Sequence, residues 1–204
     1  MFRKVLSISV VLFGILFFQS TAECFDEHEY YTREDLSTSE RVRQFYKYVT
    51  SKWPVNKIWT QMCETMTVIA DGNDTISEAA IDKLVADYSG NQYLPWALVE
   101  TGVFCRLINK PQIGLELNQR VINNWPSHEG SMWSLKEAAM LNIELGNIEA
   151  AQTATNTVFT NFAQSEWIAS IGNEIADCYI KSGKYEEAKQ VCQYIVEQIG
   201  RAHV

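Results

Sequence analysis

The sequence is poor in histidine, proline and glycine. Only His28, His128 and His203 could supply an imidazole, which leaves little material for histidine-based acid–base catalysis or a histidine metal site. Four prolines and ten glycines exclude collagen-like and low-complexity chains, and 47% hydrophobic residues exclude a wholly disordered one. The 204 residues therefore belong to a folding chain.

Basic residues are also scarce. The chain has 17 Lys and Arg against 25 Asp and Glu, a formal net charge of -8. Two of the cations lie near the N-terminus, so residues 23–204 carry 15 basic against 25 acidic side chains, a net charge of -10. No local basic stripe offsets this acidity, so the protein would repel a phosphate backbone, and we do not expect a nucleic-acid partner.

Motifs of common catalytic sites are missing. The sequence has no Gly-rich phosphate loop, HExxH motif, nucleophile elbow or calcium-binding loop. Its carboxylates fall mainly on positions that a helix turns toward solvent, as on an ordinary acidic surface. His128 lies in a junction between helices, where an exposed loop histidine is the ordinary interpretation and a pH switch is the alternative. We expect no catalytic residue, no cofactor, no metal and no enzymatic activity in the residues present.

Residues 1–22 have the layout of a secretory signal peptide. Two basic residues precede an apolar run at 5–18, which is too short to span a bilayer comfortably, and small residues after it favour cleavage after Ala22. We therefore expect an exported protein, periplasmic or secreted, with no membrane span after cleavage. An uncleaved anchor is one alternative. Lipid attachment at Cys24 is another, but Glu23 stands where a lipoprotein signal has a small residue.

The remaining chain divides into three predicted parts. Residues 23–40 hold seven acidic side chains and one basic one without apolar periodicity, which indicates a solvated acidic linker. Residues 41–198 form a repeat array. Residues 199–204 break the repeat and match a translated sequencing adapter, so we expect a non-native tail on a fragment; a native basic tail is the alternative.

Three series of residues recur in the array at an interval of 37. Two are small and fall within helical patterns, and the third consists of residue types that turn the chain. The series are Thr65, Gly102, Ala139 and Ala176; Ser77, Gly114, Ala151 and Ala188; and Gly72, Asn109, Gly146 and Gly183. Between the turns, segments such as 94–108 and 132–145 have apolar residues at helical spacing.

This pattern predicts antiparallel helix pairs that cross closely where side chains are small. Each second helix is expected to stop at an aromatic residue followed by proline or a small residue, at Trp53-Pro54, Tyr88-Ser89, Trp125-Pro126 or Phe162-Ala163. One hairpin cannot bury its faces alone, so stacked hairpins share a continuous core. The predicted fold class is all-α, a solenoid of about four stacked antiparallel helix hairpins with about 37 residues per unit.

The string Gly183-Lys184-Tyr185-Glu186-Glu187-Ala188, with Ala176 before it, resembles the tetratricopeptide repeat, and residues 146–151 are a weaker copy. The long unit with its aromatic–proline endings is similar to the periplasmic tetratricopeptide-like proteins of envelope assembly and Tol–Pal-associated coordination. The resemblance covers residues 41–198. It implies a tetratricopeptide-like α-solenoid whose first helices line a concave groove for a partner in the cell envelope.

The resemblance also implies which residues line that groove. They form a ladder in which a tryptophan recurs every 37 residues and methionine or valine follows one or two turns later. They are Trp59, Met62, Met66, Trp96, Val99, Val103, Trp133, Lys136, Met140, Asn173 and Asp177. An aromatic and methionine surface suits an extended or helical peptide. The alternative is that the tryptophans only seal neighbouring hairpins, as a repeat array requires with or without a ligand.

The sequence therefore predicts an exported scaffold that binds another protein, or a peptide segment, in its concave face. One alternative is a targeting region of a larger enzyme whose catalytic domain follows residue 198. Another is an oligomerising structural protein of the envelope. The soluble or tethered state, the oligomeric state and the partner's identity stay open.

The five cysteines show no CxxC and no zinc-site spacing. Because four of them lie in apolar helical patterns, we expect buried thiols that act as small hydrophobes. A disulfide between Cys178 and Cys192 across one hairpin is the alternative.

Overall fold

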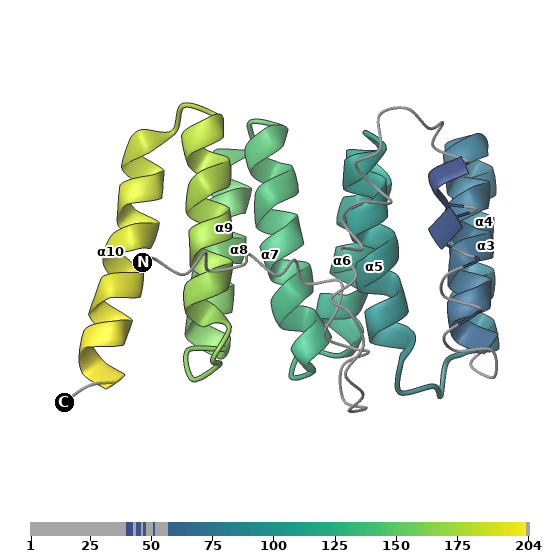
Figure 1. Ribbon diagram of the computed structural model, residues 1–204, viewed down its shortest axis with the longest axis horizontal. Helices are drawn as coiled ribbons and strands as arrows, with labels where there is room; N and C mark the ends of the chain where they lie inside the picture. The colour runs from purple at the N-terminus through teal and green to yellow at the C-terminus, as the bar shows by residue number, and fades with distance from the viewer. Residues whose placement is uncertain (1–39, 43, 46, 48–50, 52–56, 203–204) are drawn as a thin grey trace. The chain divides into compact units, whose positions relative to one another are not determined.

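The computed structural model describes residues 40–42, 44, 45, 47, 51 and 57–202, and this part of the chain contains helices and no strand. The helices are α3 (Lys57–Asp71), α4 (Asp74–Asp87), α5 (Leu94–Leu107), α6 (Pro111–Asn124), α7 (Glu129–Glu144), α8 (Ile148–Asn161), α9 (Ile168–Lys181) and α10 (Tyr185–Ala202) (Figure 1). The predicted all-α fold class is confirmed. The predicted signal peptide, the acidic linker up to residue 39 and the Trp53-Pro54 helix end lie outside the described residues.

The helices belong to two compact units, divided after Ile108. In the first unit α3 and α4 form a hairpin, and α5 packs beside α3. In the second unit α7 and α8 form one hairpin and α9 and α10 another, with α6 against α7 and α9 against both α7 and α8 (Figure 1). Within this second unit the hairpins therefore stack side by side, as the repeat predicts.

The small residues predicted at the helix crossings are buried. This holds for both series, Thr65, Gly102, Ala139 and Ala176 in first helices and Ser77, Gly114, Ala151 and Ala188 in second helices. The two hydroxyls among them are satisfied inside their own helices, since Thr65 donates to the Gln61 carbonyl and Ser77 to the Asn73 carbonyl, each at 2.9 Å. A larger side chain at these positions would push packed helices apart.

The turn series is confirmed at three of its four positions. Asn109, Gly146 and Gly183 have φ values of 59°, 78° and 72°, in the left-handed region that ends many helices. Gly72 does not adopt this conformation, and its N–H donates to the Val68 carbonyl at 2.7 Å. The difference arises because α4 begins early, after Asn73, whose side chain accepts from the Ile76 N–H at 3.0 Å and caps the helix.

The conformation of Gly146 leads to a stability prediction. An added Cβ would meet no atom within 4 Å, but its φ of +78° strains any L side chain. We expect Gly146→Ala to lower the free energy of unfolding by about 1–2 kcal/mol. Gly90→Ala is the matched control, because an added Cβ there also meets open space while φ lies outside that region. Urea unfolding followed by circular dichroism compares the two, and equal effects would contradict the conformational explanation.

Three of the predicted helix ends are confirmed. Tyr88, Trp125 and Phe162 are the C-caps of α4, α6 and α8, and each backbone N–H donates to the carbonyl four residues earlier. The last helix, α10, continues to Ala202, and the predicted array end at residue 198 with a non-native tail after it stays a prediction. Within the described ranges, no helix combines the length and the apolar character needed to cross a membrane.

Candidate functional site

Most of the predicted groove residues are buried. Met140 is half-buried, Asn173 and Asp177 are exposed, and the others have exposed fractions of 8% or less. These buried residues are Trp59, Met62, Met66, Trp96, Val99 and Val103 in the first unit and Trp133 and Lys136 in the second. Their burial favours the interpretation that the tryptophans seal the packing of the hairpins. That a partner touches these residues stays a prediction.

Two of these tryptophans pack on aromatic residues that the repeat analysis did not single out. The Trp59 ring centroid lies 6.1 Å from that of Tyr93, and the Trp133 centroid lies 6.3 Å from that of Trp167, both in tilted arrangements. Tyr93 and Trp167 are the N-cap residues of α5 and α9. Each tryptophan thus contacts the start of the next first helix, and such aromatic pairs add to the stability gained from burial alone.

Lys136 joins the two first helices of the second unit. Its Nζ lies 2.7 Å from Glu174 Oε2 on α9 and 3.0 Å from Glu137 Oε1 on its own helix. Nζ also lies 5.3 Å from the Trp133 ring centroid, within cation–π range. Burial alone would lower the pKa of Lys136, but the charges of Glu137 and Glu174 outweigh it and raise the pKa. The ammonium group is therefore charged and holds α7 against α9.

The open part of the predicted surface in this unit consists of one half-buried methionine and two exposed polar residues. We define the α7/α9 face as Met140, Asn173 and Asp177. At this face α7 and α9 lie close together, as shown by the Cys178 thiol on α9, which donates a hydrogen bond to the Met140 carbonyl on α7 at 3.8 Å. Asp177 forms an exposed ion pair with Lys181 one turn later, at 2.6 Å. Because such exposed pairs contribute little to stability, Asp177 can exchange this contact for one with a partner.

His128 is a helix cap rather than an exposed loop residue. It is half-buried, and its Nδ1 accepts a hydrogen bond from the Gly130 N–H at 2.9 Å at the start of α7. Burial lowers the pKa of His128, so the imidazole is neutral at neutral pH, as this hydrogen bond requires. The bond gives His128 a structural role, which the ordinary interpretation of a junction histidine did not foresee.

The described cysteines are thiols. Cys63, Cys105 and Cys178 are buried as expected, but the expectation was wrong for Cys192, which is exposed on α10. All four are free thiols, so the alternative of a Cys178–Cys192 disulfide is not observed. Burial, together with the neighbouring charge of Glu64, raises the pKa of Cys63 to about 12, which keeps that thiol protonated and unreactive. In the part of the chain that the structure describes, no group of three or more His, Cys, Asp or Glu side chains is placed to hold a metal ion.

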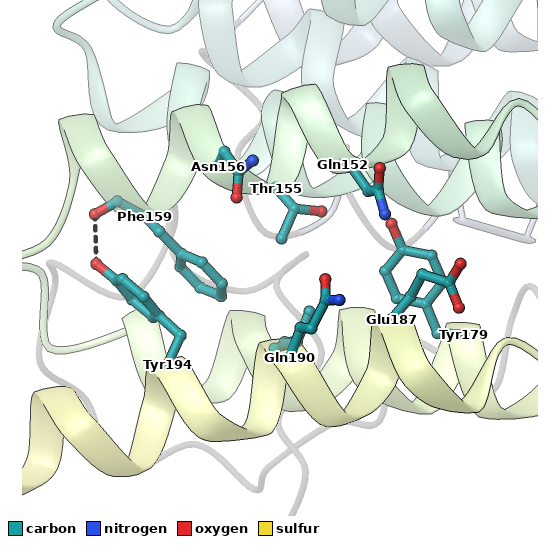
Figure 2. Close-up of a pocket in the computed structure, with 9 residues that line it drawn as sticks. Gln152, Thr155, Asn156, Phe159, Tyr179, Glu187, Gln190 and Tyr194 are labelled. Carbon is teal, nitrogen blue, oxygen red and sulfur yellow. Dashed lines mark hydrogen bonds between the residues drawn. The ribbon is translucent and has the colours of Figure 1, made fainter.

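A pocket of about 300 Å³ lies between the second helices α8 and α10, with α9 behind it (Figure 2). We call it the α8/α10 pocket. Its lining residues are mostly polar: Gln152, Thr155, Asn156 and Phe159 on α8, Tyr179 on α9, and Glu187, Gln190, Val191 and Tyr194 on α10. The sequence analysis did not identify this site, because it searched the first helices and the pocket belongs to the second helices.

No protein-family profile matches this chain, and no curated protein matches it. Among solved structures, the crystal structure of MamA is similar over 89% of this chain and 99% of that chain, with 16% sequence identity and a TM-score of 0.48. At this identity and score the likeness does not bear on function, so the functional argument depends on the residues described above.

Proposed function

We propose that this protein is a non-catalytic helical-repeat scaffold that binds another protein through its first helices. The observation that carries the proposal is the ion pair from Lys136 on α7 to Glu174 on α9, at 2.7 Å in a largely buried site. It ties together α7 and α9, the two adjacent first helices that carry the α7/α9 face. A face that is already rigid loses little conformational freedom when a partner binds, which favours association.

The acidic charge of the chain and the signal-peptide layout of its N-terminus support a more specific proposal about the partner. The chain has a net charge of -8, and the α7/α9 face carries the exposed carboxylate of Asp177. A partner segment with basic residues would be attracted to such a face. The signal-peptide layout of residues 1–22 supports export, and we therefore propose a partner in the cell envelope.

Site-specific photo-crosslinking in the cells that naturally contain the protein tests this proposed binding function. A photoreactive amino acid replaces Asn173 on the α7/α9 face or, as the control, Thr160, which is exposed on α8. We expect one discrete crosslinked adduct from position 173 and none from position 160. We also expect Asp177→Lys to reduce the adduct from position 173 severalfold, because it reverses the charge of the face. Identical adducts from both positions, or none from position 173, would contradict the proposal.

A further inference from the structure

We propose that the α8/α10 pocket binds a guanidinium group, the head of an arginine side chain. This inference is independent of the proposed function, because the pocket is built from α8, α9 and α10 and contains no residue of the α7/α9 face. Its volume of about 300 Å³ is at the lower end of the range for ligand sites and suits a single side chain.

At one end of the pocket the Phe159 and Tyr194 rings stack, with centroids 4.1 Å apart and planes 11° apart. The Tyr194 hydroxyl also donates to the Phe159 carbonyl at 2.7 Å, which ties α10 to α8 (Figure 2). At the other end the Tyr179 hydroxyl points toward the Gln152 side chain, with Glu187 beside it (Figure 2). The stacked rings and this hydrogen bond therefore hold α8 and α10 in place on either side of the pocket, and the polar groups of Tyr179, Gln152 and Glu187 gather at the other end.

The Tyr179 hydroxyl is a buried polar group without a hydrogen bond. The residue is 1% exposed, and its oxygen has no hydrogen-bond partner in the described part of the chain. Burial raises the pKa of Tyr179, and the nearby Thr155 hydroxyl lowers it without forming a hydrogen bond of ordinary geometry with the Tyr179 oxygen. An unsatisfied buried hydroxyl is costly, so a ligand that hydrogen-bonds to the Tyr179 oxygen recovers the lost interaction.

The other polar groups of the pocket determine the charge of the ligand. Glu187 is the one charged residue in the lining, and it forms no ion pair with another described residue. Its neighbour Glu186 faces Lys189 at 3.8 Å. The side-chain amides of Gln152, Asn156 and Gln190 also have no hydrogen bond to described residues. A site with an unpaired carboxylate and several amide oxygens attracts a cation and repels an anion.

A guanidinium group matches this arrangement better than an ammonium group. It is planar, it carries five N–H donors and no acceptor, and it binds a carboxylate through two parallel hydrogen bonds. It is also more weakly hydrated, so it enters a half-enclosed site more easily. Two donors would engage Glu187, and the others would reach the amide oxygens and the Tyr179 oxygen. The Tyr179 proton could then turn to the Gln152 amide oxygen.

The test is an NMR titration of the full chain with Nα-acetyl-L-arginine amide, followed through the side-chain amide signals of Gln152 and Gln190. We expect saturable shifts of both signals. The equivalent citrulline derivative has nearly the same shape without the charge, and we expect it to bind at least about tenfold more weakly, a difference of about 1.4 kcal/mol. The equivalent lysine derivative should also bind more weakly than arginine, because it lacks the planar donor fork.

Two pairs of variants assign the binding to the pocket. Glu187→Gln and Tyr179→Phe should each weaken arginine binding by about fivefold or more. Glu186→Gln and Tyr185→Phe are the matched controls, because both residues are exposed neighbours outside the lining, and their affinities should not change. Circular dichroism verifies that each variant is folded. If Tyr179→Phe does not fold, Glu187→Gln still decides the question.

Three results would overturn the inference. Citrulline that binds as tightly as arginine would indicate a site for neutral polar groups. No shift of the Gln152 and Gln190 signals would indicate a pocket that holds only water. An affinity that does not change in Glu187→Gln would place the binding elsewhere. The crosslink from position 173 is expected to persist in Glu187→Gln, so failure of this inference is distinguishable from failure of the proposed function.

Discussion

Replacement of Lys136 by methionine should lower the free energy of unfolding by about 3–5 kcal/mol. The Lys136 side chain is 4% exposed, and its partners Glu137 and Glu174 are 2% and 25% exposed. Methionine has a similar volume but no charge, so the substitution leaves two carboxylates in a buried site without their cation. Removing one member of a buried ion cluster is costly because the remaining charges have lost both water and partner.

Urea unfolding of two further variants isolates this cause. Lys181→Met removes a lysine whose side chain is 75% exposed and is paired with Asp177, and we expect a loss of only about 0–1 kcal/mol. Combining Lys136→Met with Glu137→Gln and Glu174→Gln removes the charges together, and we expect much of the stability to return. A loss in Lys136→Met no larger than in Lys181→Met would show that the buried cluster does not matter to folding.

The pH dependence of this contribution has a definite sign. The pKa of Lys136 is raised above its usual value of 10.5 in the folded protein. The stabilisation is therefore fully present below pH 10.5 and is lost as the pH rises through the folded-state pKa. Unfolding experiments near neutral pH measure its full value.

The repeat interval predicted the helices and turns because both depend on local requirements. A close helix crossing needs a small residue, and a left-handed turn needs a residue that tolerates positive φ. Gly146 and Gly183 meet the second requirement, as does Asn109. Gly72 does not adopt the predicted left-handed conformation. Only two residues separate α3 from α4, against three between α7 and α8, and the second of the two, Asn73, is already the N-cap of α4.

The functional surfaces were harder to predict because burial depends on residues distant in the sequence. A tryptophan at a fixed place in each repeat can line an open groove or fill a packed junction, and the interval is the same in both cases. Trp133 is packed because Trp167 meets it from the start of α9. Lys136 is a signal that could have indicated packing, since a cation among mostly apolar ladder residues needs a carboxylate partner when it is buried. The α8/α10 pocket could not be predicted in this way, because it depends on the direction of the Tyr179 side chain, which no pattern in the sequence indicates.

Substitution of Trp133 by alanine separates the two interpretations of the tryptophan ladder. The side chain is 1% exposed, and its ring packs on Trp167 and beneath the Lys136 ammonium. We expect Trp133→Ala to lower the free energy of unfolding by about 3–5 kcal/mol, because it leaves a large cavity in the packed unit. If Trp133 instead lined an open groove, the variant would lose partner binding while its stability stayed nearly unchanged.

Two substitutions accompany this measurement. Trp133→Phe keeps an aromatic ring and removes an indole N–H that has no hydrogen-bond partner among the described residues, so we expect a smaller loss than for alanine. Tyr185→Ala truncates an aromatic residue that is 67% exposed and should change the stability by no more than about 0.5 kcal/mol. The photo-crosslink from position 173, normalised to folded protein, then decides the role of Trp133. An unchanged yield in Trp133→Ala assigns the residue to packing alone, and a reduced yield from fully folded protein assigns it to the partner-binding surface.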